Sequence, residues 1–171
     1  LITPAPHDGD IHERLILSNG NSVILGITDS ITDLSAYTFD GLPGGMNTKL
    51  ASTNIIELDS NDSIVFEWIG SDHVHPTEYM DGISSYDSAY FDYLHANAID
   101  VDFDGHYLLS QRSTSSILKI NRQTGNIIWR LGGSLSDFTF TNDGGISAQH
   151  FIRSLGNNKY SLFDNGNQNA P

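Results

Sequence analysis

The sequence contains no cysteine and few basic residues. Without cysteine there is no disulfide, no thiolate nucleophile and no cysteine-ligated zinc site, and the redox compartment is left open. Lysine and arginine total 8 against 21 aspartate and glutamate residues, which gives a formal net charge of −13. Because so acidic a surface repels nucleic acid and anionic membranes, we expect neither as a partner. An anionic substrate would need a local cationic pocket on this chain, and each arginine is therefore of interest.

Long apolar runs and helical periodicity are also missing. No run approaches the 18 apolar residues of a membrane-spanning helix, so we expect no membrane insertion, and no signal pattern opens the chain. No segment keeps apolar residues at i, i+3, i+4 and i+7 for three turns, which predicts almost no helix. Because the chain begins at Leu1 rather than at a methionine, we expect a processed chain or part of a longer one.

The residues that are present favour an all-β domain. The 171 residues suffice for one domain with a real core, and we treat 1–171 as a single domain. Sixteen glycines, with many Asn, Asp and Ser residues, indicate a chain rich in turns. Short alternating segments bounded by such residues predict hairpins of 12–17 with 22–28, 54–58 with 63–69, and 145–153 with 160–163. Two longer stretches lack this pattern: 29–52 is predicted to be an irregular connection, and 70–92 a long loop over one face.

The stretch Tyr93–Gly133 predicts four short strands in about forty residues, which is typical of one β-propeller blade. Its opening at His95 is repeated at His12 and at His150, each followed by a strand, a turn and a second strand. We therefore predict a β-propeller segment of about two and a half to three four-stranded antiparallel blades. Because a ring closes with four to eight blades, this chain needs further blades or a partner.

Three histidines at matching positions should converge, because the first strand of each blade lines the central channel. Arg112 closes the strand next to the one that carries His95. Histidine can act as nucleophile, acid or base near neutral pH, and arginine matches two oxygens of a sulfate or phosphate. An oxyanion site is therefore predicted. Two alternatives remain: polar channel residues bound to backbone and water, and a zinc site of three imidazoles.

The repeats carry a family resemblance. The stretch 95–133, the Asp10-Ile11-His12-Glu13 strand, and Gln149-His150 with Phe163-Asp164-Asn165-Gly166 resemble, in the same order, motifs of the arylsulfotransferases that need no nucleotide donor. The resemblance implies a six-bladed propeller that moves a sulfuryl group from a phenolic sulfate donor to a phenolic acceptor by a ping-pong route. It also implies an extracellular or periplasmic location.

Individual roles follow from the same resemblance. His150 matches the nucleophile that becomes a sulfohistidine, while His12, His95 and Arg112 match residues that bind the sulfate and assist proton transfer to the leaving phenol. Asn97 matches a further polar residue of the pocket. The chain departs from the family at Phe151, where a small or acidic residue usually follows the histidine.

Two other interpretations stay open. Asp100, Asp102 and Asp104 precede Gly105 in the spacing of a calcium loop, although a simple turn also explains Asp104-Gly105, and we otherwise expect no cofactor. The alternative function is a non-catalytic propeller module for extracellular binding or self-assembly, as a homo-oligomer or with the missing blades, through exposed blade edges. Trp68 and Trp129, which end matching strands, are predicted to pack between blades.

Overall fold

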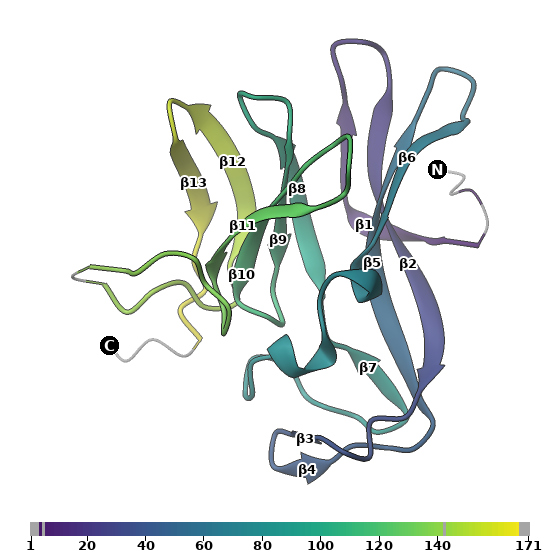
Figure 1. Ribbon diagram of the computed structural model, residues 1–171, viewed down its shortest axis with the longest axis vertical. Helices are drawn as coiled ribbons and strands as arrows, with labels where there is room; N and C mark the ends of the chain where they lie inside the picture. The colour runs from purple at the N-terminus through teal and green to yellow at the C-terminus, as the bar shows by residue number, and fades with distance from the viewer. Residues whose placement is uncertain (1–3, 5, 142, 168–171) are drawn as a thin grey trace.

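The computed structural model describes Pro4 and residues 6–141 and 143–167, and in these ranges the protein is all-β with no α-helix (Figure 1). This confirms the predicted class. Besides two 3₁₀ helices, η1 (Gly70–Asp72) and η2 (Pro76–Glu78), the described residues form β1 (Asp8–Ile16), β2 (Ser22–Thr32), β3 (Thr38–Phe39), β4 (Leu42–Pro43), β5 (Thr48–Leu58), β6 (Ile64–Ile69), β7 (Tyr90–Asp92), β8 (Ala96–Val101), β9 (Tyr107–Gln111), β10 (Ser116–Ile120), β11 (Ile127–Gly132), β12 (His150–Gly156) and β13 (Lys159–Phe163). None of these elements is a helix long and apolar enough to cross a membrane.

The first sheet has the order β1-β2-β5-β6, and β7 adds to β5 in parallel. The prediction of an irregular connection over 29–52 is wrong at both ends, which belong to strands. β2 and β5 pair without interruption from Ser22↔Leu58 to Thr32↔Thr48. Continuous backbone pairing holds the polar residues at these ends in strands, although they lack the apolar alternation used to recognise a strand. Only the short hairpin of β3 and β4 and its flanking turns separate the two long strands.

The second sheet confirms the four strands predicted within Tyr93–Gly133. Its order is β11-β10-β9-β8, with every neighbour antiparallel. The Asp104-Gly105 turn between β8 and β9 uses a glycine at φ +84°, a conformation that residues with a Cβ rarely adopt. The third sheet is the hairpin of β12 and β13, which begins at His150 rather than at the predicted residue 145.

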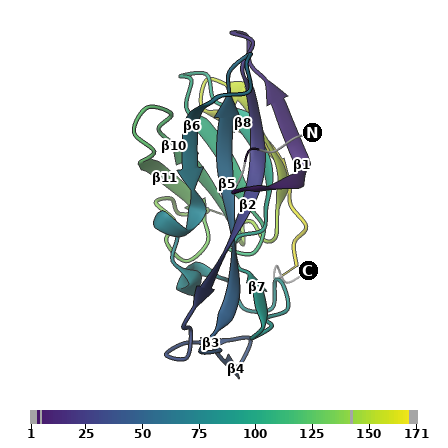
Figure 2. The same cartoon turned by 90° about the vertical axis from the view of Figure 1, so that its right-hand side faces the viewer.

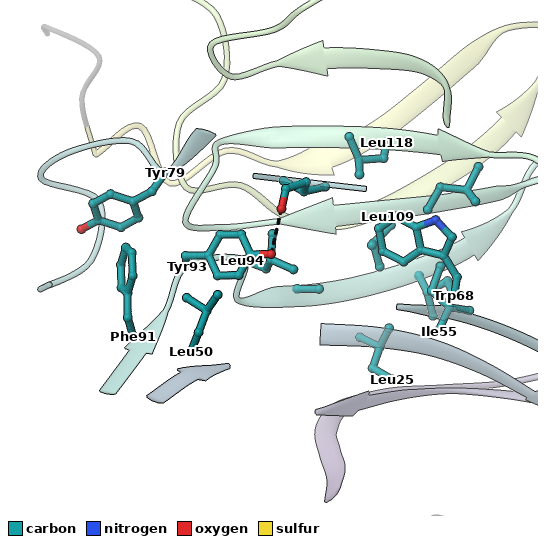
Figure 3. Close-up of a cluster of buried hydrophobic side chains, with 14 of the residues drawn as sticks. Leu25, Leu50, Ile55, Trp68, Tyr79, Phe91, Tyr93, Leu94, Leu109 and Leu118 are labelled. Atoms are coloured by element: carbon teal, nitrogen blue, oxygen red, sulfur yellow. Dashed lines mark hydrogen bonds between the residues drawn. The ribbon is translucent and has the colours of Figure 1, made fainter. Parts of the chain in front are cut away.

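The second sheet lies between the other two (Figures 1 and 2), and its central strands β9 and β10 are buried on both faces. On β9, Leu109 faces the first sheet and Leu108 faces the third, as the two-residue period of a strand requires. Trp68 of β6 is fully buried in the core between the first and second sheets (Figure 3), and its Nε1 donates to the carbonyl of Gly125 at 3.0 Å. Trp129 of β11 contacts Tyr160 of the third sheet. Both tryptophans thus pack between neighbouring sheets.

The segment 70–92 contains η1, η2 and β7 and contributes to the core. The buried rings of Tyr79 and Tyr86 both pack against Phe91, and all three pack against Phe39 of the β3–β4 hairpin. The Tyr93 hydroxyl, just after β7, donates to the carbonyl of Val74 at 2.8 Å (Figure 3). These contacts fix the segment at one end of the sheets, from which it leads directly into His95.

Candidate active site

The three predicted histidines lie at irregular points in, or just before, the first strand of each sheet. His12 lies where the β1–β2 register shifts between Gly9 and Arg14. His95 directly precedes β8 with a φ of +46°, and His150 opens β12, whose register shifts before Arg153. Bulges of this kind redirect side chains and are common beside active sites. Since β8 contacts both β1 and β12, the three strands that carry or follow these histidines are neighbours.

The structure brings His12, His95, Arg112 and His150 together. The imidazole rings of His12 and His95 meet edge to face, with centroids 5.5 Å apart. Burial lowers the pKa of His150, and the positive charges of Arg112, His12 and His95 lower it further, outweighing the opposing effect of the Ala148 carbonyl. His150 is therefore neutral at pH 7 and lies within electrostatic reach of the other three side chains.

Two aspartates orient the first two histidines. Asp10 Oδ1 lies 2.7 Å from His12 Nδ1, and Asp92 Oδ2 lies 2.8 Å from His95 Nδ1. Each aspartate also accepts the backbone N–H of its histidine, at 2.8 and 3.0 Å respectively. With Nδ1 engaged, Nε2 is the nitrogen left for a ligand in both rings. Asp10 and Asp92 were not predicted to have a role, although an aspartate two residues before His12 and one three residues before His95 were local signals.

His150 has a different partner. Its Nδ1 lies 3.1 Å from the carbonyl oxygen of Ala148, which can only accept a hydrogen bond. Nδ1 therefore carries the proton, and the lone pair of the neutral ring is on Nε2. A neutral imidazole without a carboxylate partner is suited to attack, whereas a ring backed by a carboxylate is suited to hold a proton.

Arg112 and Asn97 complete the set of predicted residues. Arg112 donates its backbone N–H to the carbonyl of His95 at 3.0 Å, and its Nη1 donates to Ser84 Oγ at 2.6 Å. Asn97 lies in the bulge of β8 and donates from Nδ2 to the carbonyl of Gln149 at 2.9 Å. Its Oδ1 is buried and has no hydrogen-bond partner among the described residues.

The unusual residues after His150 connect two strands of the site. Arg153 lies with its guanidinium 3.8 Å above the ring of Phe151 and forms an ion pair with Glu13, the residue after His12. Glu13 also accepts the backbone N–H of Ile99 on β8 at 2.9 Å. Phe151 therefore packs against an ion pair that joins β12 to β1 and, through Glu13, to β8. Residue types alone did not reveal this role.

In the candidate calcium loop, a lysine side chain already pairs with two of the three aspartates. The ammonium of Lys119 lies 2.6 Å from Asp102 and 2.7 Å from Asp104, while Asp100 accepts the backbone N–H of Ser154. Across the described ranges, no group of three or more His, Asp or Glu residues is arranged to hold a metal ion. The geometry therefore gives no support to zinc on the three imidazoles, and calcium binding stays a prediction.

A family model described as arylsulfotransferase (ASST) matches residues 2–171. The chain belongs to the arylsulfotransferase family. The resemblance inferred from the motifs is thus confirmed, and an arylsulfotransferase-like function is supported in general. A comparison of this arylsulfotransferase chain with curated proteins gives no match.

Proposed function

We propose that this arylsulfotransferase chain transfers a sulfuryl group from a phenolic sulfate ester to a phenol through a sulfohistidine on His150. One observation carries the proposal: a neutral His150, with its proton on Nδ1 and its lone pair on Nε2, lies within electrostatic reach of His12, His95 and Arg112. This arrangement supports His150 as the nucleophile, His12 and His95 as proton donors, and Arg112 as the ligand of the sulfuryl oxygens.

In the first half-reaction, His150 Nε2 attacks the sulfur of the aryl sulfate. An N–S bond forms while the S–O bond to the aromatic ring breaks, and the phenolate oxygen takes a proton from the imidazolium of His12 or His95. Asp10 and Asp92 stabilise those imidazoliums through Nδ1. Arg112 stabilises the charge that spreads over the sulfuryl oxygens in the transition state, the main catalytic requirement in the related phosphoryl transfer.

The second half-reaction reverses these steps with another phenol. The deprotonated histidine accepts the phenol proton, the phenol oxygen attacks sulfur, and the N–S bond breaks to restore neutral His150. The free Oδ1 of Asn97 is an acceptor that could bind a hydroxyl or a protonated imidazole beside His150. A cationic pocket within a chain of net charge −13 confines anion binding to this site.

We further propose that the three sheets are successive blades of a β-propeller, completed by further sheets of the same protein or a partner outside the cytoplasm. Support comes from the outer sheets, which leave large apolar side chains exposed in this chain, including Ile16, Ile31, Leu155 and Phe163. In a ring such side chains would pack against neighbouring blades. The alternative, a module that only self-assembles through these faces, does not explain why Asp10 and Asp92 are paired with His12 and His95.

The test is transfer from 4-nitrophenyl sulfate to phenol, followed by release of 4-nitrophenol. His150→Ala should abolish transfer, and the wild type mixed with donor alone should gain the mass of one sulfuryl group on the peptide that contains His150. His106→Ala is the matched control, because His106 lies outside the site against Arg122. Full transfer by His150→Ala would refute the nucleophile, and an inactive, self-associating wild type would favour the assembly module.

A further inference from the structure

Arg112 depends on a residue of the segment 70–92 for its position. Its Nη1 donates to Ser84 Oγ at 2.6 Å, while its backbone N–H is bound to the carbonyl of His95. Ser84 lies 28 residues before Arg112 in the chain. A guanidinium has five N–H donors in a rigid fork, so a single bond to serine limits its rotation and leaves other donors for sulfuryl oxygens.

Ser84 is itself held by its surroundings. Its Oγ lies 3.1 Å from Ser113 Oγ, and its carbonyl accepts from the Tyr79 hydroxyl at 2.6 Å. The backbone N–H of Met80 donates to the carbonyl of Ser113 at 2.9 Å, which ties the same segment to the β9–β10 turn. The hydroxyl that meets Arg112 is therefore presented by a segment fixed at several points.

Asp40, at the tip of the β3–β4 hairpin, organises this segment. Its Oδ1 accepts the backbone N–H of Gly82 at 2.7 Å, and its Oδ2 accepts that of Tyr86 at 2.8 Å. Oδ2 also lies 2.8 Å from the Tyr79 hydroxyl. Hydrogen bonds to a carboxylate are about twice as strong as neutral ones, so one side chain fixes both ends of the turn that contains Ser84.

We propose that residues 79–86 form a positioning element in which Asp40 fixes the turn and Ser84 sets the orientation of Arg112 toward the transferred sulfuryl group. This inference rests on the proposed function. Ser84 and Asp40 are positioning residues, because they act through Arg112 and not on the substrate. Pre-orienting the guanidinium lowers the entropy lost when the transition state forms, so the effect should appear in kcat more than in KM.

The experiment compares Ser84→Ala, Ser84→Thr and Asp40→Asn with Ser85→Ala, whose side chain is exposed. Loss of a hydrogen bond to a charged group predicts that Ser84→Ala lowers kcat about tenfold or more with little change in KM. Ser84→Thr keeps the hydroxyl and should retain kcat, Asp40→Asn should behave like Ser84→Ala, and Ser85→Ala should match the wild type. In an Arg112→Met background, Ser84→Ala should cause no further loss.

A second readout does not require activity. In the ¹⁵N-labelled protein, the Nη–H signals of Arg112 should exchange faster with solvent in Ser84→Ala than in the wild type or Ser85→Ala. An unchanged kcat and unchanged Arg112 signals in Ser84→Ala would overturn the inference, as would an equal loss in the Arg112→Met background. A wild type without transferase activity refutes the proposed function, while the Arg112 signals still decide whether Ser84 holds the guanidinium.

Discussion

The hydroxyl of Tyr107 on β9 donates a 2.5 Å hydrogen bond to Glu57, a carboxylate buried in β5 of the preceding sheet. The next junction has a similar arrangement, since Tyr160 on β13 donates at 2.8 Å to Asp102, which directly follows β8 of the second sheet. In each case the tyrosine lies in the second strand of one sheet, and the carboxylate lies in or directly after a strand of the sheet before it. The repeat in the sequence is thus accompanied by a repeated polar contact between sheets.

This junction predicts the effect of Tyr107→Phe on stability. Glu57 would lose one donor but keep Arg122 and Asn21. A buried carboxylate with an unfilled acceptor site should lower the free energy of unfolding by about 1–2 kcal/mol, measured by urea denaturation. Tyr37→Phe is the control, because the Tyr37 ring is partly exposed. Equal stability of Tyr107→Phe and wild type would contradict a stabilising junction.

The second junction predicts acid sensitivity. Burial would raise the pKa of Asp102, but hydrogen bonds from Lys119, Ser154 and Tyr160 outweigh it and lower the pKa from 3.8 to about 2. As the pH falls, the unfolded chain binds this proton before the folded one does, so the stabilisation is complete above about pH 5 and is lost as the pH falls through 2. The stabilisation amounts to roughly 2 kcal/mol. The free energy of unfolding, measured across this pH range, should therefore decline less steeply for Asp102→Asn than for the wild type. Parallel curves for the two proteins would rule out this linkage.

His150 should titrate below its ordinary value of 6.5, because burial and three neighbouring positive charges disfavour its protonated form. Transfer should therefore persist at pH 6.5 and fall only at lower pH, where Nε2 becomes protonated. The ring signals of His150 in an NMR titration measure this directly. Arg112→Met should raise the pKa of His150, whereas Lys159→Met, a change on exposed β13, should leave it unchanged. A His150 titration at or above 6.5 in the wild type would disprove the electrostatic coupling.

Asp92→Asn tests the carboxylate behind His95. The amide keeps the size of the side chain but removes the charge that stabilises an imidazolium and favours one tautomer. We expect kcat to fall about tenfold or more, with KM for the aryl sulfate changed little. Asp87→Asn in the same segment is the control, since the exposed Asp87 side chain accepts the backbone N–H of its near neighbour Ala89. A selective rise in KM would instead assign Asp92 to substrate binding.

A chelator should leave the transfer rate unchanged, because the groups of the proposed reaction are histidines and arginine and Lys119 already lies between Asp102 and Asp104. The measurement is the rate of 4-nitrophenol release before and after dialysis against EDTA. Loss of activity that calcium restores would instead support the Asp100, Asp102 and Asp104 site.

Much of the fold could be predicted from local pattern. Alternating residues and turn glycines located the four strands of Tyr93–Gly133, and the matching positions of the three histidines indicated their convergence. The long ends of β2 and β5 were missed because their strand character comes from pairing with each other, not from apolar alternation. Segment 70–92 was predicted as a loop, but its buried aromatic rings belong to the core.

The sequence by itself determined the all-β class, the family and the residues of the candidate site, because these depend on period, turn residues and ordered motifs. Only the tertiary structure decided how those residues are held. His150 faces a carbonyl while His12 and His95 face carboxylates, Arg112 rests on Ser84, and Arg153 pairs with Glu13, 140 residues away in the chain. Arg112 and Arg153 have partners distant in sequence, whereas the partner of each histidine lies two or three residues before it. In both cases the hydrogen bond depends on the positions of atoms in space, which a local pattern does not contain.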